Sequence, residues 1–487
     1  MGPFDRFIPD TLQVVSAIFL ITSIAIAVII ILEKRSPFKT AAWILVLVLL
    51  PVFGLIFYLF FGQDYRRRKL FSRKGLKELG KLRKLITKQL RQISKNHLNL
   101  SPAVIERERL ISLLLKNSDA LLTTGNRVKI LNNGEATFEA IFKSIENARH
   151  HIHLEYYIID DDETGNRLKN LLIKKSLQGV DVRLIIDDVG SWGLKKKFLN
   201  ELSNAGVEVY PFMKVRFPRL TSRVNYRNHR KIAIIDGEEG FTGGINFADR
   251  YKYGLKKIGP WRDTHLKIEG DAVACLQVIF AADWFFVSHK NLEGKNYYLP
   301  FSEKPGVPVQ VAASGPDSDW ESIGQAFFTA ISCAKKNVYI TTPYLIPPLS
   351  ILTALKTAAL GGIDVRIIIP EKSDAKISKW GSFSFVQELL EAGVRVYFYQ
   401  AGFIHSKLLM VDSIVASVGT TNLDFRSIET NFEVNAFLYD EKVTKALEHH
   451  FKNDLESSRE IMLEEWIKRR WHFKLRESLA HIVSPML

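Results

Sequence analysis

Two stretches of this 487-residue chain carry the same set of polar side chains at the same spacing. The shared pattern is His-x-Lys-x4-Asp, followed by an Asn 17 residues after the His. The two copies consist of His229, Lys231, Asp236 and Asn246, and of His405, Lys407, Asp412 and Asn422. One match would be weak evidence, but two copies that also share the downstream Asn indicate two related units.

These side chains could carry out chemistry on a phosphate ester. Two imidazoles, two ammonium groups and two amides, brought together across a pseudo-twofold axis, would form a site rich in donors and poor in carboxylates. One His can attack phosphorus and form a covalent phosphohistidine, while the other protonates the departing oxygen and then deprotonates the next nucleophile. Lys and Asn would neutralise the charge that builds on the phosphate oxygens. Such a site requires no metal and no other cofactor.

A nucleophilic His also needs an acceptor for its Nδ1 proton, so that Nε2 is free to attack. Asp263 and Glu433 occur late in the strands that follow the two motifs, and they are our candidates for orienting the histidines. Surface salt bridges are the alternative explanation for both carboxylates.

Other polar clusters are weaker candidates for chemistry. His150, His151 and His153 lack the carboxylates that a metal site would add, and the end of a helix leading into a strand explains them better. Asp187 and Asp188 end a strand of the parallel type, where ligands often bind. Because carboxylates repel phosphate, we interpret these two as structural residues or as acceptors for substrate hydroxyls.

Short strands are expected to position the motif residues. The apolar residues 232–235 and 408–411 predict two buried strands that end in a polar turn. Residues two apart in a strand share a face, so each His and its Lys point the same way. Asp236 and Asp412 complete the catalytic motifs but lie at the far ends of these strands, so we interpret them as structural.

The residues around the motifs alternate between helix and strand patterns, which is typical of an α/β fold. The predicted series is a helix at 138–149, a strand at 152–159, a helix at 168–177 and a strand at 180–186, with counterparts at 327–335, 338–345, 351–360 and 363–369. We therefore predict a duplicated α-β-α sandwich with a junction between residues 297 and 306. The first half has extra basic and apolar residues around 212–224, which could hold a lipid phosphate or form a variable surface loop.

Two apolar runs near the N-terminus predict transmembrane helices. Residues 11–32 and 41–61 are each long enough to cross a hydrocarbon core of roughly 30 Å. A signal peptide is the alternative for the first run, but Asp5 and Asp10 do not suit its basic leading segment. The heavier basic flank follows the second run, which predicts that the catalytic part is cytoplasmic.

The net charge of +15 is concentrated in residues 66–95, which hold thirteen Lys or Arg and one Glu. The rest of the chain is therefore almost neutral, which argues against the basic groove of a nuclease or nucleic-acid-binding protein. An amphipathic helix on anionic lipid and a solvated helix packed on the catalytic domain both remain open for this segment. Cys275 and Cys333 are too few for a disulfide framework and fit a reducing compartment.

The C-terminal segment from residue 466 is amphipathic, and its Trp and Arg suit either a membrane interface or ordinary helix packing. The predicted layout therefore has four parts: 1–65 as two transmembrane helices, 66–120 as a basic amphipathic linker, 121–300 as the first half of the catalytic domain, and 301–487 as the second half.

The paired motifs, each ending in Gly-x-x-Asn, resemble those of the phospholipase D superfamily. The resemblance narrows to the bacterial cardiolipin synthases and covers essentially the whole chain. It is carried by residues 228–232, 241–246, 42–43, 51–54 and the ending Ser484-Pro485-Met486-Leu487. It implies two phospholipase D-like halves that share one active site across the pseudo-twofold axis.

The resemblance also implies residue roles. His229 would attack and His405 would act as the acid, while Gly244 and Thr420 would bind substrate together with Asn246 and Asn422. Thr420 stands where a Ser is usual, which keeps the hydroxyl, adds a methyl group and bears on headgroup preference.

The implied reaction is phosphatidyl transfer in the bacterial inner membrane by a multi-pass protein. One phosphatidylglycerol would form phosphatidyl-histidine and release glycerol, and a second would supply the attacking hydroxyl, giving cardiolipin. The alternatives are a phospholipase D-type hydrolase, a transferase for another phospholipid donor or acceptor, and a membrane-tethered binding protein with an inactive site, which the complete motifs disfavour. We expect phosphatidylglycerol and anionic lipids as partners and no nucleic acid, with a homodimer as an open option.

Overall fold

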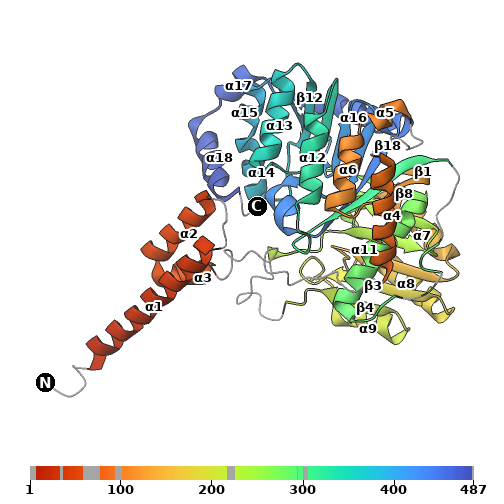
Figure 1. Cartoon of the computed structure of the whole chain (residues 1–487), viewed down its shortest axis with the longest axis horizontal. Coiled ribbons are helices and arrows are strands. Elements are labelled where there is room, and N and C mark those ends of the chain that lie inside the picture. Colours follow the sequence, from red (N-terminus) through yellow and green to blue (C-terminus); the bar gives the residue numbers. More distant parts are fainter. Residues whose placement is uncertain are drawn as a thin grey trace. The chain divides into compact units, whose positions relative to one another are not determined.

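The computed structural model of the chain describes residues 7–32, 37–58, 77–93, 101–215, 225–292, 294, 296–299 and 305–484. The protein divides into two units, residues 1–68 with 215–226 and residues 69–214 with 227–487. The larger unit carries both motifs (Figure 1). The loop between the predicted spans at 33–36, the basic residues 66–76, the loop residues 216–224 and the ending 485–487 lie outside the described residues.

The larger unit is built on a sheet of fifteen strands. From the centre outward, its first half runs β1 (Leu122–Asn132), β8 (Thr264–Gly270), β6 (Glu239–Gly243), β5 (Lys231–Ile235), β2 (His151–Tyr156), β3 (Asp181–Asp187) and β4 (Glu208–Phe212). Its second half runs β9 (Val307–Ser314), β18 (Glu433–Tyr439), β16 (Val415–Gly419), β15 (Leu408–Val411), β10 (Asn337–Thr341), β12 (Asp364–Pro370) and β13 (Arg395–Tyr399), extended by β19 (Ser458–Glu460). The strand order is the same in both halves, so the motif strands β5 and β15 occupy equivalent positions.

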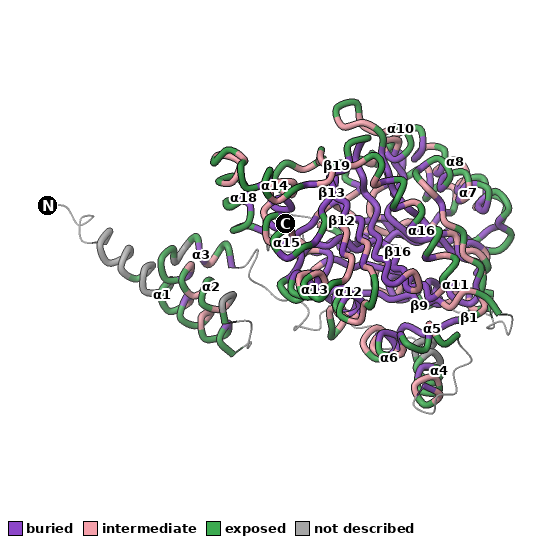
Figure 2. Tube along the Cα trace, turned by 90° about the horizontal axis from the view of Figure 1, so that it is seen from above, coloured by how far each residue is buried: buried purple, intermediate pink, exposed green. Residues whose placement is uncertain are grey.

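Helices connect and cover these strands. The crossovers between parallel strands are α8 (Glu163–Leu177) and α9 (Lys196–Asn204) in the first half, and α13 (Leu349–Leu360), α14 (Lys376–Ser384) and α15 (Val386–Glu391) in the second. The other helices of this unit are α4 (Lys77–Ile93), α5 (Pro102–Ile105), α6 (Glu108–Asn117), α7 (Asn133–Asn147), α10 (Arg250–Tyr253), α11 (Asp271–Ser288), α12 (Ser322–Ser332), α16 (Glu441–Glu456), α17 (Leu463–Ile467) and α18 (Trp471–Val483). Helices flank both faces of the sheet and the buried residues follow its strands (Figure 2), which confirms the predicted α/β class.

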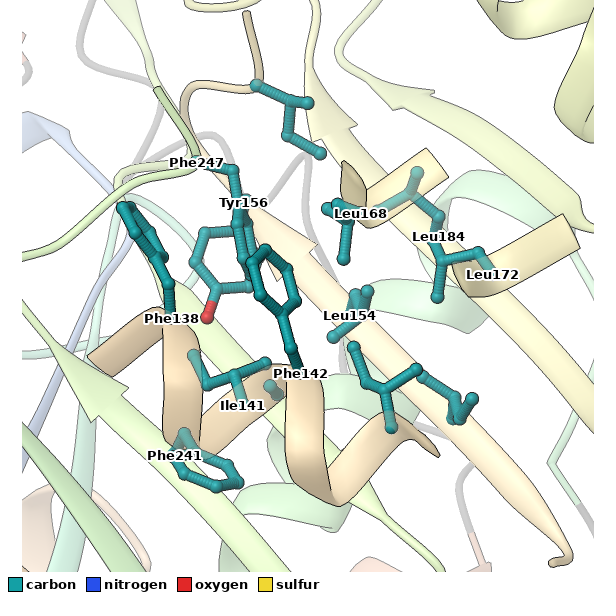
Figure 3. Close-up of a cluster of buried hydrophobic side chains, with 14 of the residues drawn as sticks. Phe138, Ile141, Phe142, Leu154, Tyr156, Leu168, Leu172, Leu184, Phe241 and Phe247 are labelled. Atoms are coloured by element: carbon teal, nitrogen blue, oxygen red, sulfur yellow. The ribbon is translucent and has the colours of Figure 1, made fainter. Parts of the chain in front are cut away.

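The apolar spacing of α7 supports one end of the site. Phe138 and Phe142 lie one turn apart, and both rings stack on Phe247, with centroids 5.7 and 6.0 Å from it (Figure 3). Tyr156 of β2 packs on the same ring at 4.5 Å. Burying a side chain of this size contributes about 1.5–3 kcal/mol. Because Phe247 directly follows Asn246, this cluster fixes the loop that carries a candidate site residue.

Length and hydropathy select α11 as the helix, within the described residues, that could cross a membrane. However, 61% of it is buried inside the protein, where it packs against β1, β8 and β9. We therefore assign α11 to the hydrophobic core. Shorter apolar helical stretches occur at Leu20–Leu32 and Thr40–Leu49.

The smaller unit contains α1 (Phe7–Leu32), α2 (Pro37–Leu49) and α3 (Pro51–Phe57). The prediction of a second continuous span at 41–61 is wrong, because the helix breaks before Pro51. Proline lacks an N–H, and its ring clashes with the carbonyl four residues earlier. The rings of Trp43 and Tyr58 meet edge-on at 5.5 Å, whereas a continuous helix would hold these residues about 22 Å apart. The chain therefore folds back on itself after α2.

Candidate active site

Short parallel pairings between the two halves place the motif histidines. The backbone amide of His405 donates to the carbonyl of Arg262 at 2.7 Å, and that of His229 donates to Phe432 at 2.9 Å. Both accepting residues directly precede a candidate carboxylate, so each His meets the carboxylate of the opposite half. The pairings join β14 (Phe403–Ile404) to β7 (Trp261–Arg262), and Asn228 to Phe432.

His229 faces Glu433 in a buried setting. Its Nδ1 lies 3.0 and 2.9 Å from the two oxygens of that carboxylate. Burial lowers the pKa of His229 to about 4, although the Glu433 carboxylate raises it. The ring of Tyr157 meets the imidazole edge-on at 5.1 Å. His229 is therefore neutral near pH 7, and its Nδ1 faces Glu433.

His405 faces Asp263, at 2.7 Å from Nδ1 to Oδ2. Burial lowers the pKa of this imidazole well below its usual value, and the nearby Lys407 and Lys231 lower it further. Burial also raises the pKa of Asp263. The rings of Trp261 and Tyr251 pack around His405 with centroids at 5.2 and 5.9 Å.

The two motif lysines lie beside the histidines. The ammonium of Lys231 donates to the carbonyl of His229 at 2.7 Å, and that of Lys407 donates to the carbonyl of His405 at 2.5 Å. Lys407 Nζ also lies 3.0 Å from His405 Nδ1. Burial lowers the pKa of Lys231 to about 7 and that of Lys407 to about 8. A bound anion would raise both pKa values, because a negative neighbour favours the ammonium form.

A cavity of about 530 Å³ opens in front of both histidines. Asn246 and Asn422 line it, one from each half. Asn246 Oδ1 accepts from the amide of Ile158 at 3.1 Å, and its Nδ2 donates to the hydroxyl of Tyr251 at 2.5 Å. The structure thus brings together the predicted His and Asn residues, with the Lys residues directly behind the histidines.

Gly244 and Thr420 differ from the expectation that they bind substrate. They occupy equivalent positions behind the two carboxylates. A Cβ at Gly244 would lie 2.1 Å from Asp263 Oδ1, so only glycine lets that carboxylate approach. Thr420 is fully buried, and its hydroxyl donates to Glu433. Both residues therefore act on the orienting carboxylates.

Asp236 and Asp412 tie the motif strands to their neighbours. Asp236 accepts hydrogen bonds from the consecutive backbone amides 149–151, and Asp412 from 335–337. Arg107 also donates to Asp412 at 2.6 Å. Both carboxylates are committed to backbone amides at the strand ends and neither lines the cavity, which fits the structural interpretation of these two motif members.

The weaker candidates are also structural. Asp187 is fully buried, contacts Arg227 at 3.3 Å and accepts from the amide of Asn228 at 2.8 Å, which does not fit the alternative of a hydroxyl acceptor. His153 is buried 3.0 Å from the side-chain oxygen of Gln277, and burial lowers its pKa well below the usual value. Among the described residues, no group of three or more His, Cys, Asp or Glu is placed to hold a metal ion.

Comparison with known proteins decides the family. Residues 141–255 and 327–455 match the family described as "Cardiolipin synthase, PLD-like domain". Cardiolipin synthase 2 of Bacillus anthracis is 44% identical over 476 residues, which is 96% of this chain and 91% of that protein. The chain belongs to the cardiolipin synthase family. The resemblance inferred from the motifs is thus confirmed.

Other relatives extend this result within the family. The "Major cardiolipin synthase ClsA" of Bacillus subtilis is 41% identical over 98% of this chain and 99% of its own length. Residues 20–63 match a second family, described as "Phospholipase_D-nuclease N-terminal". The phosphatidylserine synthase of Haemophilus influenzae Rd KW20 shares the fold with a TM-score of 0.60, at 15% identity, over 78% of this chain and 100% of that structure.

The cavity also contains residues that the sequence analysis did not select. They are Tyr157, Arg227, Arg250, Tyr251, Tyr344, Asp374, Asp424 and Arg426. A signal for two of them exists, because Arg250 and Arg426 each follow a motif Asn by four residues. Tyr251 follows Arg250 on α10, but nothing comparable marks Tyr157, Tyr344 or Asp374.

Proposed function

We propose that this chain is a phosphatidyltransferase that makes cardiolipin and glycerol from two molecules of phosphatidylglycerol. The observation that carries the proposal is the crossed arrangement of the site. Each half supplies a His whose Nδ1 faces a carboxylate of the other half, and both histidines line one cavity. Two imidazoles that face the same space suit a double displacement at one phosphorus atom.

In the first step, Nε2 of His229 attacks phosphorus and the bond to the glycerol oxygen breaks. The bound phosphate favours the imidazolium form of His405, because a negative neighbour raises the pKa of a histidine. This imidazolium keeps its Nδ1 proton beside Asp263 and gives its Nε2 proton to that oxygen, so that glycerol leaves neutral. The product of this step is a phosphatidyl group on His229. Glu433, at 2.9 Å from Nδ1, stabilises the positive charge that develops on the attacking ring.

In the second step, a hydroxyl of another phosphatidylglycerol loses its proton to His405 and attacks the same phosphorus. The phosphorus–nitrogen bond breaks, which frees His229 and releases cardiolipin. The ammonium groups of Lys231 and Lys407, with Asn246 and Asn422, would stabilise the charge on the phosphate oxygens in both transition states. No step calls for a metal or another cofactor.

The alternative reaction is hydrolysis, in which water replaces the lipid hydroxyl and phosphatidic acid is the product. Transfer to another phospholipid headgroup is the third option. We favour lipid transfer because placing the site at a bilayer raises the local concentration of lipid hydroxyls and orients them, which is an effective-molarity advantage.

We propose that the smaller unit holds the enzyme on the bacterial inner membrane, with the catalytic unit on the cytoplasmic side. In α1, the side chains of Ile18, Ile21 and Leu32 are 58%, 67% and 72% exposed, far above what an apolar residue adopts in a protein core. Lipid is the solvent that suits such a surface. Under this proposal, residues 1–65 form the membrane part, 66–120 the linker, and 121–300 and 301–487 the two catalytic halves.

The test uses the full chain, purified and reconstituted in phosphatidylglycerol vesicles with EDTA present. We expect cardiolipin and glycerol in equal amounts by mass spectrometry, and neither product from a His229→Ala protein. Vesicles that also contain phosphatidylethanolamine report acceptor choice. Phosphatidic acid as the sole lipid product would show a hydrolase, and activity restored only by one added metal would contradict the proposed chemistry.

A further inference from the structure

The two halves of the cavity share one pair of arginines and differ in other lining residues, among them Arg227, whose counterpart in the second half is Phe403. Each half supplies an Arg four residues after its motif Asn, as Arg250 and Arg426. Equivalent bridges hold these loops, Ile159 to Phe247 in the first half and Leu345 to Leu423 in the second. Positions on either side of these bridges can therefore be compared directly between the halves.

That comparison gives two substitutions between the halves. The residue before the first bridge member is Ile158 in the first half and Tyr344 in the second. The residue after the second bridge member is Ala248 in the first half and Asp424 in the second. Tyr344 and Asp424 both line the cavity. At these two positions, the second half supplies a hydroxyl and a carboxylate where the first half has apolar residues.

The carboxylates of the cavity are concentrated near His405, where the charge of Arg250 is paired with Asp160 at 2.7 Å. Near His229, burial and Asp187 raise the pKa of Tyr157, whose ring contacts that imidazole, and the charges of Arg426 and Arg227 oppose this rise. Near His405, the carboxylates of Asp263 and Glu433, and less strongly those of Asp374 and Asp424, counteract the lowering of the pKa of Lys407 by burial. A phosphate group is therefore favoured on the His229 side and disfavoured beside the two carboxylates.

The acidic side has acceptors to offer a neutral, hydroxyl-rich group. Asp424 is only 4% exposed, and its Oδ1 accepts from the amide of Ser427 at 2.7 Å. A carboxylate can accept about four hydrogen bonds, so capacity remains for ligand hydroxyls. The hydroxyl of Tyr344 donates to Asp374 at 2.8 Å, which leaves the lone pairs of that hydroxyl for a donor in the cavity.

We propose that Asp424, together with the Tyr344–Asp374 pair, forms a subsite that binds the hydroxyl groups of a glycerol headgroup beside His405. This inference rests on the proposed function and names the group that the acidic side recognises. The leaving glycerol occupies the subsite in the first step and the acceptor glycerol occupies it in the second. His405 is then the residue that gives a proton to the former and takes one from the latter.

The subsite selects for more than one hydroxyl. One hydroxyl must reach phosphorus, so it is a second hydroxyl, on the neighbouring carbon, that donates a hydrogen bond to Asp424. A site built to bind a substrate hydroxyl discriminates strongly against an analogue that lacks it, because its buried polar atom then stays unpaired. Water and simple alcohols, which lack the second hydroxyl, are the poorer acceptors.

The test measures how the intermediate partitions between small acceptors. The full chain in mixed micelles receives a phosphatidyl-p-nitrophenol donor, whose release of nitrophenolate needs no glycerol, together with glycerol and 1-propanol at equal concentrations. The ratio of phosphatidylglycerol to phosphatidylpropanol does not depend on how much intermediate forms. We expect wild type to favour glycerol and Asp424→Asn to reduce that ratio at least about tenfold, which one hydrogen bond to a charged group accounts for.

Asp424→Asn keeps the oxygen that accepts from Ser427 and replaces the other by an NH2 donor, so the local fold is retained. Tyr344→Ile and Asp424→Ala install the residues of the first half, and we expect both to lower the same ratio. Glu441→Ala, an exposed carboxylate on α16, is the matched control and leaves the ratio unchanged.

The possible results separate the two levels of the proposal. A wild-type protein that releases no nitrophenolate contradicts the proposed function itself. Release with an unchanged glycerol-to-propanol ratio in folded Asp424→Asn and Tyr344→Ile proteins overturns the hydroxyl subsite. Loss of transfer to added ethanolamine, with transfer to glycerol retained, would assign the carboxylates to an ammonium group and overturn it as well.

Discussion

The two histidines of the site have the same backbone setting and different neighbours at Nδ1. His229 Nδ1 faces both oxygens of Glu433, and the hydroxyl of Thr420 donates to the same carboxylate. His405 Nδ1 faces one oxygen of Asp263 and also lies 3.0 Å from Lys407 Nζ. Duplication has thus preserved the geometry of the pair while the protonation of each ring is controlled differently.

This difference suits two different roles. The carboxylate beside His229 holds the proton on Nδ1, which leaves the lone pair on Nε2 for attack. At His405, Asp263 favours a proton on Nδ1 whereas Lys407 favours one on Nε2. Neither neutral tautomer has a proton to spare, so His405 gives and then retakes its Nε2 proton through the imidazolium, a charge that the Asp263 carboxylate favours and Lys407 disfavours. We infer from this comparison that His229 is the nucleophile and His405 the acid and base.

The largest expected effect comes from removing either imidazole. With phosphatidylglycerol, His229→Ala and His405→Ala should each lower cardiolipin synthesis at least about 10³-fold. The phosphatidyl-p-nitrophenol donor separates the roles of the two histidines, because nitrophenolate is a good leaving group and needs no acid. We expect His405→Ala to release about one nitrophenolate per enzyme and to retain a phosphatidyl group, and His229→Ala to release none.

The measurement is a rapid-mixing burst followed by mass spectrometry of the denatured protein. A phosphorylated peptide that contains His405 in the His229→Ala protein would reverse the assignment. A Glu441→Ala protein serves as the control for preparation and lipid content.

The orienting carboxylates should give the next largest effect. We expect Glu433→Gln and Asp263→Asn each to reduce the rate roughly 10- to 100-fold, the range for carboxylates that orient metal-binding histidines. Glu433→Gln should slow nitrophenolate release, whereas Asp263→Asn should slow mainly the attack of alcohol on the intermediate. Equal slowing of both steps by both variants would show that the two pairs have no separate roles.

The pH dependence of kcat/KM sharpens this test. Burial lowers the pKa of His229 to about 4, so the attacking neutral form is lost only as the pH falls through about 4. Glu433 raises that pKa, so Glu433→Gln should move the acid limb to still lower pH. A carboxylate with a purely structural role would change the rate without moving the limb.

The sequence predicts the repeated part of this site well, and the reason is local. The motif His and Lys residues lie at the start of strands β5 and β15 or within three residues before them, and the motif Asn residues lie in the loops that follow the next strands, so their spacing is visible in the chain. The exchange of carboxylates between the halves depends on contacts between residues far apart, such as His229 with Glu433, 204 positions away. No pattern within one half indicates which His meets which carboxylate.

Two other differences have identifiable causes. The second apolar run contains Pro51, a residue that ends helices, yet hydropathy alone treats the run as one span. The family resemblance implies that Thr420 binds substrate, but its hydroxyl donates to Glu433. In both cases, the chemistry of a single residue decides the outcome.

The smallest expected effect tests that Thr420 contact. Thr420→Ser keeps the hydroxyl and should leave the rate of nitrophenolate release nearly unchanged. Thr420→Val keeps the shape but removes the donor to Glu433, which should slow the release about three- to tenfold. The corresponding position beside Asp263 is Gly244, where any side chain collides with the carboxylate, so the first half has no room for such a donor. If Thr420 supports Glu433 specifically, Thr420→Val should leave the partition between glycerol and propanol unchanged while it slows the burst. A changed partition without a slower burst would mean that Thr420 acts on the acceptor. The contact with Thr420 would then no longer distinguish the setting of His229 from that of His405.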